Sequence, residues 1–168
     1  MNIPVDLVPL LTELASTRDE RLPWYGPGGE PFRDRSYRPG SWTAHQLLVH
    51  LADTETVLLD RVRRLAADDK PLLWAFDQNA WADRLGYAQR DLATAGRLFA
   101  VARETMLELA VGFSSTSLAH TGVHTERGKV TLADTLAGIA RHTRHHLGQL
   151  TALAQGDTWS STAAVHYR

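Results

Sequence analysis

The sequence predicts an all-α protein, a four-helix bundle formed by a single domain over residues 1–168. Apolar residues recur at helical spacing in several long segments, whereas no segment shows the alternating pattern of a strand. A chain of 168 residues also suits one domain with its own core. The expected connections of about 15 to 25 residues are longer than simple antiparallel hairpins need, so we expect a crossover topology.

The first half of the chain contains two of the predicted helices. Residues 5–16 form the first one, and residues 22–40, rich in Pro, Gly and aromatic side chains, form a long ordered loop. Ser41 is the expected N-cap of the second helix, which covers residues 42–67. The apolar face of this helix consists of Leu47, Leu51, Leu58, Val62 and Leu65.

The second half contains the other two long helices, after a short helical turn over residues 77–84. The third helix covers residues 91–111, and residues 112–130 are expected to form a polar loop. The inner face of this third helix is expected to contain Leu92, Leu98 or Phe99, Met106 and Leu109. Thr131 and Asp134 form a predicted capping box at the start of the fourth helix, which ends near Gln155, before Gly156. Residues 157–168 are expected to form a flexible tail.

Composition excludes several classes of protein. The chain has no cysteine, which excludes a disulfide scaffold, a thiolate metal site, an iron–sulfur cluster and a cysteine nucleophile. A net charge of −1 gives no general attraction to nucleic acid. Neither a signal peptide nor a membrane-spanning apolar run is present in the sequence, so we expect a cytoplasmic protein that binds neither membrane nor nucleic acid.

The main chemical signal lies in the fourth predicted helix. His142 and His146 are four residues apart, which places them on one face of a helix, close to the core position Ile139. His145 falls on the flank of that face. Two histidines at this spacing can chelate one ion, whereas the alternative for each is a hydrogen-bonded core histidine.

A third ligand has to come from another helix. His50 is the best candidate because it lies in the middle of the second helix, beside its apolar face. Three imidazoles suit Zn, Ni, Cu, Co or Fe(II) better than Mg or Ca. Three protein ligands leave a coordination position open, which is typical of catalytic sites.

Asp53 follows His50 by one helical turn. It is the candidate catalytic base near the metal, or a carboxylate that orients a ligand imidazole. The alternative is a solvated carboxylate or an ion-pair partner of Arg61 or Arg64. The remaining histidines are expected at the surface or in loops: His45, His120, His124 and His166.

Four segments together resemble a known family. Residues 41–55 hold Trp42, His50 and Asp53 in a Trp…His-x-x-Asp pattern, and residues 142–150 read HTRHHLGQL; residues 71–82 and 124–128 add to the match. These segments are similar to the DinB-like and YfiT-like superfamily of metalloenzymes, particularly its bacillithiol S-transferase branch. The chain departs from that pattern at Gln78, Thr125 and Gln149.

The resemblance implies a four-helix bundle, a homodimer, and a zinc or nickel ion held by His50, His142 and His146. It also implies an enzyme acting on small molecules. The leading expectation is a thiol S-transferase that joins a low-molecular-weight thiol, such as bacillithiol, to an electrophile. The alternatives are a metal-dependent hydrolase and a non-catalytic, stress-related metal-binding bundle.

Overall fold

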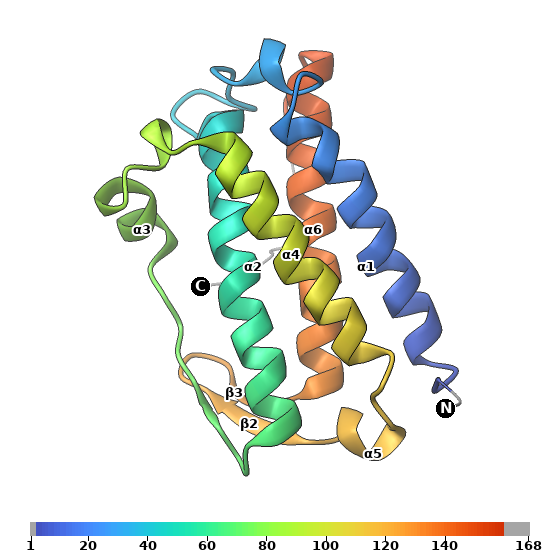
Figure 1. Cartoon of the computed structure of the whole chain (residues 1–168). Helices are drawn as coiled ribbons and strands as arrows, with labels where there is room; N and C mark the ends of the chain where they lie inside the picture. Colours follow the sequence, from blue (N-terminus) through green and yellow to red (C-terminus); the bar gives the residue numbers. More distant parts are fainter. Residues whose placement is uncertain (1–2, 160–168) are drawn as a thin grey trace.

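Four long helices lie side by side along the molecule (Figure 1). The computed structural model describes residues 3–159. The long helices are α1 (Leu7–Arg21), α2 (Ala44–Ala67), α4 (Leu92–Ala110) and α6 (Leu132–Gln155). Helix α6 contacts α1 and α2, and α4 contacts the same two helices. The order around the bundle is therefore α1, α6, α2, α4, which confirms the predicted four-helix bundle.

The helix directions confirm the predicted crossover. Helices α1 and α6 run one way and α2 and α4 the other, so the consecutive long helices α2 and α4 are parallel (Figure 1). The chain therefore returns along the length of the bundle between them. This return segment contains β1 (Leu72–Leu73), α3 (Gln78–Arg84) and η3 (Tyr87–Gln89). No helix within residues 3–159 is both long and apolar enough to cross a membrane.

Helix α2 begins later than predicted. Its N-cap is Thr43, whose hydroxyl accepts a hydrogen bond from the Gln46 amide, while the Gln46 side chain accepts one from the Thr43 amide. This capping box determines the start of the helix. The Ser41 hydroxyl instead donates to the Arg38 carbonyl in the preceding turn. The prediction of Ser41 as N-cap was therefore wrong.

Helix α6 ends and begins as the sequence predicts. Thr131 accepts from the Asp134 amide and Asp134 accepts from the Thr131 amide, so the expected capping box is present. Gly156 ends the helix with a φ of +77°, a left-handed conformation that favours glycine. On α4, Phe99 is the one of the two expected alternatives that faces the core, whereas Leu98 is exposed. Leu109 was also expected on the inner face, but it is exposed.

The expectation that residues 112–130 form a polar loop was wrong, because this segment contains short elements of secondary structure. Within residues 112–130, the chain forms α5 (Ser115–Leu118) and the strand β2 (Thr121–His124), and β3 (Gly128–Thr131) follows. Strands β2 and β3 pair antiparallel, and β1 pairs parallel to β2. These strands are too short to show an alternating pattern, since only two or four residues form each one.

The core has two apolar clusters separated by polar side chains. One cluster includes Leu14, Leu58 and Ile139, and the other includes Tyr25, Leu48 and Leu150. On α2, α4 and α6, buried polar residues fall between members of the two clusters, and on α1 the buried polar residues Thr17 and Arg21 follow Leu14 of the first cluster. We call five of these residues the polar belt: Thr17, Arg21, Glu55, Arg103 and Thr143.

Arg103 is the centre of the polar belt. Its guanidinium contacts both carboxylate oxygens of Glu55, and it donates to the Thr143 hydroxyl over 2.9 Å. It also donates to the Leu14 carbonyl over 2.9 Å and to the Thr17 hydroxyl over 3.1 Å. A buried ion pair can offset its desolvation cost only with such additional hydrogen bonds. Arg103 thus links all four helices, because its partners lie on α1, α2 and α6.

Replacing Arg103 by Met should reduce the free energy of unfolding by about 3–5 kcal/mol, because Glu55 would remain buried without a partner. Urea unfolding followed by circular dichroism measures this change. The matched control is Arg144→Met, which removes an arginine that pairs with Glu13 and Glu20 at the surface. The control should lose less than about 1 kcal/mol. Similar losses in the two variants would contradict the central role of Arg103.

Candidate metal centre

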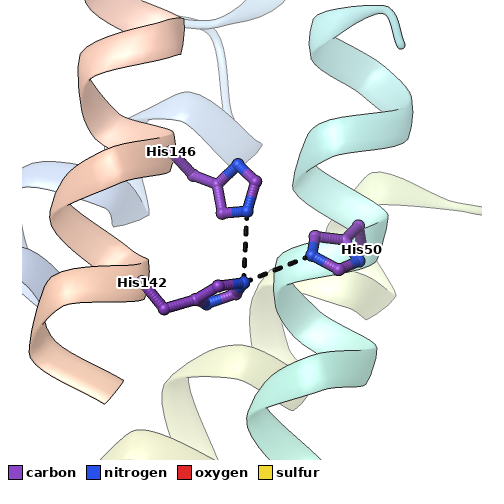
Figure 2. Close-up of side chains that lie close together, drawn as sticks. All are labelled: His50, His142 and His146. Atoms are coloured by element: carbon purple, nitrogen blue, oxygen red, sulfur yellow. Dashed lines mark hydrogen bonds between the residues drawn. The ribbon is translucent and has the colours of Figure 1, made fainter. Parts of the chain in front are cut away.

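Three histidines from two helices meet in the bundle (Figure 2). His50 comes from α2, and His142 and His146 come from α6. The Nε2 atom of His142 lies 3.4 Å from that of His50 and 3.1 Å from that of His146. One ring nitrogen of each histidine lies within 4.8 Å of a ring nitrogen of each of the other two histidines. The structure therefore brings together the three ligands proposed from the sequence.

The helix geometry explains this convergence. His142 and His146 occupy successive turns of α6, so that both imidazoles face α2 (Figure 2). His145 is only half-buried and stays outside the cluster, as its flank position predicts. Trp42 packs against the His50 ring, with 4.9 Å between the ring centroids. The packing of α2 against α6 thus positions the site.

A hydrogen bond orients the His146 imidazole. The His146 Nδ1 lies 2.7 Å from Gln149 Oε1, so Nδ1–H donates and Nε2 keeps its lone pair toward the cluster. The amide group of Gln149 also contacts His145 Nε2 at 3.2 Å. The Thr54 hydroxyl lies 3.3 Å from His50 Nδ1 and 3.4 Å from His50 Nε2, so it contacts that ring without selecting one nitrogen. Gln149, one of the departures from the family pattern, therefore positions a candidate ligand.

The electrostatic environment keeps the three rings neutral. Burial lowers the pKa of His50 to about 3. Burial also lowers the pKa values of His142 and His146 well below 6.5, and the neighbouring imidazoles add to this effect. At neutral pH each ring therefore offers a lone pair. Three neutral imidazole donors at this separation fit a divalent transition metal ion.

A cavity reaches the site from the surface. Its volume is about 250 Å³, and His146 and Gln149 form part of its wall. The other lining residues are Tyr37, Arg38, Gly40, Ser41, Trp42, Leu47 and Asn79. Because only three protein ligands converge, a small molecule in this cavity could reach an open coordination position.

Asp53 lies outside the cluster of converging ligand atoms found within residues 3–159. Its carboxylate is mostly buried and lies 3.5 Å from Arg90 Nη1. The two arginines that were considered as ion-pair partners of Asp53 make other contacts. Arg61 donates to the Trp74 carbonyl, and Arg64 pairs with Asp60. Asp53 therefore pairs with Arg90, which sequence analysis did not consider, rather than with Arg61 or Arg64. The catalytic role of Asp53 stays a prediction.

The other histidines differ in their surroundings. His120 is exposed, and His45 is half-buried and contacts the Arg90 carbonyl. His124 was expected at the surface or in a loop, but it is buried at the end of β2, where its Nδ1 accepts a hydrogen bond from the Glu126 amide. Burial and two nearby arginines lower the pKa of His124 to about 4. His166 lies outside the described residues.

The fold and the site together define a class: helical-bundle proteins with a three-histidine centre suited to a divalent metal. The chain belongs to the DinB superfamily, whose family model matches residues 10–150. This match confirms the family, whereas the bacillithiol S-transferase branch stays a prediction.

Individual relatives agree with this assignment. A protein from Oceanobacillus iheyensis, provisionally named a metal-dependent hydrolase, is 27% identical over 126 residues, covering 75% of this chain and 73% of the relative. YfiT from Bacillus subtilis has the same kind of name and is 23% identical over 128 residues, which cover 76% and 72% of the two chains.

A solved structure of YfiT is described as a probable metal-dependent hydrolase with an unusual four-helix bundle topology. It matches this chain with a TM-score of 0.82 at 20% identity, covering 95% of this chain and 92% of YfiT. The two proteins therefore share the fold.

Replacing His146 by Ala should weaken binding of Zn²⁺ or Ni²⁺ by more than about 100-fold, because it removes one of three converging nitrogens. Replacing His145 by Ala should weaken binding by less than about tenfold, because His145 contacts Gln149 and the His146 ring but contributes none of the three converging nitrogens. Competition with a chromophoric chelator measures both affinities. Equal losses from the two changes would show that the assignment of the ligands on α6 is wrong.

Proposed function

We propose that this protein is a divalent-metal-dependent enzyme that transfers a low-molecular-weight thiol to an electrophilic small molecule. The observation that carries the proposal is the meeting of three neutral imidazoles beside a cavity of about 250 Å³. His50, His142 and His146 would hold the metal, with zinc or nickel the best candidates. When bound, such an ion supplies a Lewis acid that lowers the pKa of a coordinated thiol.

The absence of cysteine supports an external thiol. The chain has no sulfur nucleophile of its own, so the sulfur has to come from a cosubstrate such as bacillithiol. The cavity beside His146 combines the aromatic rings of Tyr37 and Trp42 with the cationic side chain of Arg38. Such a lining suits a small molecule with apolar and anionic parts.

The chain itself has three tasks in this proposal. Gln149 keeps the lone pair of His146 toward the site, and Trp42 covers one face of His50 and limits its contact with water. Asp53 is the proposed base, which would accept the proton of the thiol as the sulfur–carbon bond forms and the leaving group departs. Its place on α2, one turn from His50, supports this role.

Hydrolysis is a second candidate, favoured by the names of the relatives from Oceanobacillus iheyensis and Bacillus subtilis. In that reaction water rather than a thiol would attack an ester or amide at the same site. The expected homodimer and cytoplasmic location rest on the resemblance and the composition, and both stay predictions.

Conjugation of monochlorobimane to a small thiol should require both metal and thiol. Chelation should abolish the fluorescence increase, and Zn²⁺ or Ni²⁺ should restore it, because in this proposal the metal held by the three histidines lowers the pKa of the thiol. Bacillithiol, mycothiol and glutathione are compared in this assay. Metal-dependent ester hydrolysis without thiol would favour the hydrolase. Failure of both reactions with metal fully bound would indicate a non-catalytic metal-binding protein.

Replacing Asp53 by Asn should lower kcat at least about tenfold while changing metal affinity less than about twofold, because the change removes a base but no converging ligand. The matched control is Asp60→Asn, which removes a carboxylate of α2 that pairs with Arg64 at the surface. If Asp53 serves only to pair with Arg90, the variant will lose stability while kcat stays unchanged.

A further inference from the structure

Arg21, at the end of α1, places a cation in the interior of the bundle. Its side chain is fully buried. The Nη2 atom donates to the Thr143 carbonyl over 3.2 Å, and the guanidinium carbon lies 4.6 Å from the centroid of the Phe99 ring. The Nε and Nη1 atoms are buried and have no hydrogen-bond partner among the described residues. Such unpaired charged donors are costly in a protein interior.

The polar belt does not neutralise this charge. Glu55 is its carboxylate, and Arg103 contacts both oxygens of that group. Within residues 3–159, Arg21 has no carboxylate at ion-pair distance. Burial lowers the pKa of Arg21 to about 10, so that the guanidinium is still protonated at neutral pH. The belt therefore carries an excess positive charge.

The histidine site lies beside this excess charge. The carbonyl that accepts from Arg21 belongs to Thr143, which directly follows His142 in α6. The charge of Arg21 also contributes to the lowered pKa values of His50, His142 and His146. The field of one buried cation thus reaches all three candidate ligands.

A purely structural role for Arg21 explains these contacts less well. Stacking on Phe99 and one hydrogen bond leave two donors without partners. An apolar side chain of similar size would avoid that cost. A buried cation beside a site for another cation has one clear electrostatic consequence. It opposes metal binding and favours any anion that binds to the metal.

We propose that Arg21 is a positioning residue of the histidine site, which makes the open coordination position prefer an anionic ligand, such as a thiolate, a hydroxide or a carboxylate, over a neutral one. The inference rests on the proposed metal site and names the charge class of the ligand that this site selects. Neutralising Arg21 should therefore change two affinities in opposite directions.

The test uses the full-length protein loaded with Co²⁺ and azide as the anionic probe. Arg21→Met and Arg21→Gln remove the charge, and Arg21→Lys keeps it. Arg18→Met, one turn earlier on α1, removes an arginine that pairs with Asp19 at the surface. Competition with a chelator gives the Co²⁺ affinity, and the visible absorption of the cobalt protein gives the azide affinity. Thermal unfolding monitored by circular dichroism identifies the variants that fold.

The neutral variants should bind Co²⁺ about tenfold more tightly and azide about tenfold more weakly than the wild type. Arg21→Lys and Arg18→Met should stay within about threefold of the wild type in both affinities. Arg21→Gln can still donate to the Thr143 carbonyl, so it serves as the neutral variant if Arg21→Met does not fold. If neither neutral variant folds, Arg21 is required for folding and the positioning role is overturned.

Two other outcomes separate this inference from the proposed function. If the wild type binds no Co²⁺, the proposed metal site fails and the role of Arg21 fails with it. If the wild type binds Co²⁺ but the neutral variants lose both affinities together, or keep the azide affinity, the metal site stands. Arg21 is then a structural residue, and the inference is overturned.

Discussion

Three neutral imidazoles meet in the middle of the bundle, and in each a ring nitrogen lies within 4.8 Å of the other two. Burial lowers the pKa values of all three histidines, so the rings stay neutral and each keeps one nitrogen without a proton. In a contact between two imidazole nitrogens, only one can donate a hydrogen bond. A divalent cation accepts all three lone pairs at once. A metal ion would therefore satisfy three buried nitrogens that the protein's own donors cannot all satisfy.

The architecture around the site supports this interpretation. The crossover between α2 and α4 places α2 next to α6 in antiparallel orientation, and that packing brings His50 opposite His142 and His146 (Figures 1 and 2). Arg103 ties the four helices together at the level of the polar belt. The apolar clusters on both sides of the belt stabilise the bundle. The site therefore lies on the two long helices α2 and α6, whereas the η1 and η2 turns (Leu22–Tyr25 and Glu30–Phe32) lie toward one end of the bundle.

The sequence predicted the features that depend on local spacing. The i, i+4 pair His142 and His146, and the capping box at Thr131, each follow from residues within one turn of a helix. Features that depend on distant partners had no such signal. Arg21 and Arg103 contact residues 122 and 40 positions away in the sequence, so their burial could not be read from α1 or α4 alone. The first helix was predicted to end at residue 16, whereas α1 continues to Arg21. Its last turns carry the buried polar side chains of Thr17 and Arg21, which hide the apolar pattern. His124 was missed for a related reason, since short strands bury it.

The most direct test of the central claim is a crystal structure of the metal-loaded protein with anomalous diffraction collected at the absorption edge of the added metal. One anomalous peak should lie between His50, His142 and His146, with three ligand nitrogens at about 2.0–2.2 Å. A loaded crystal with no peak there, or with its strongest peak at other residues, would contradict the account.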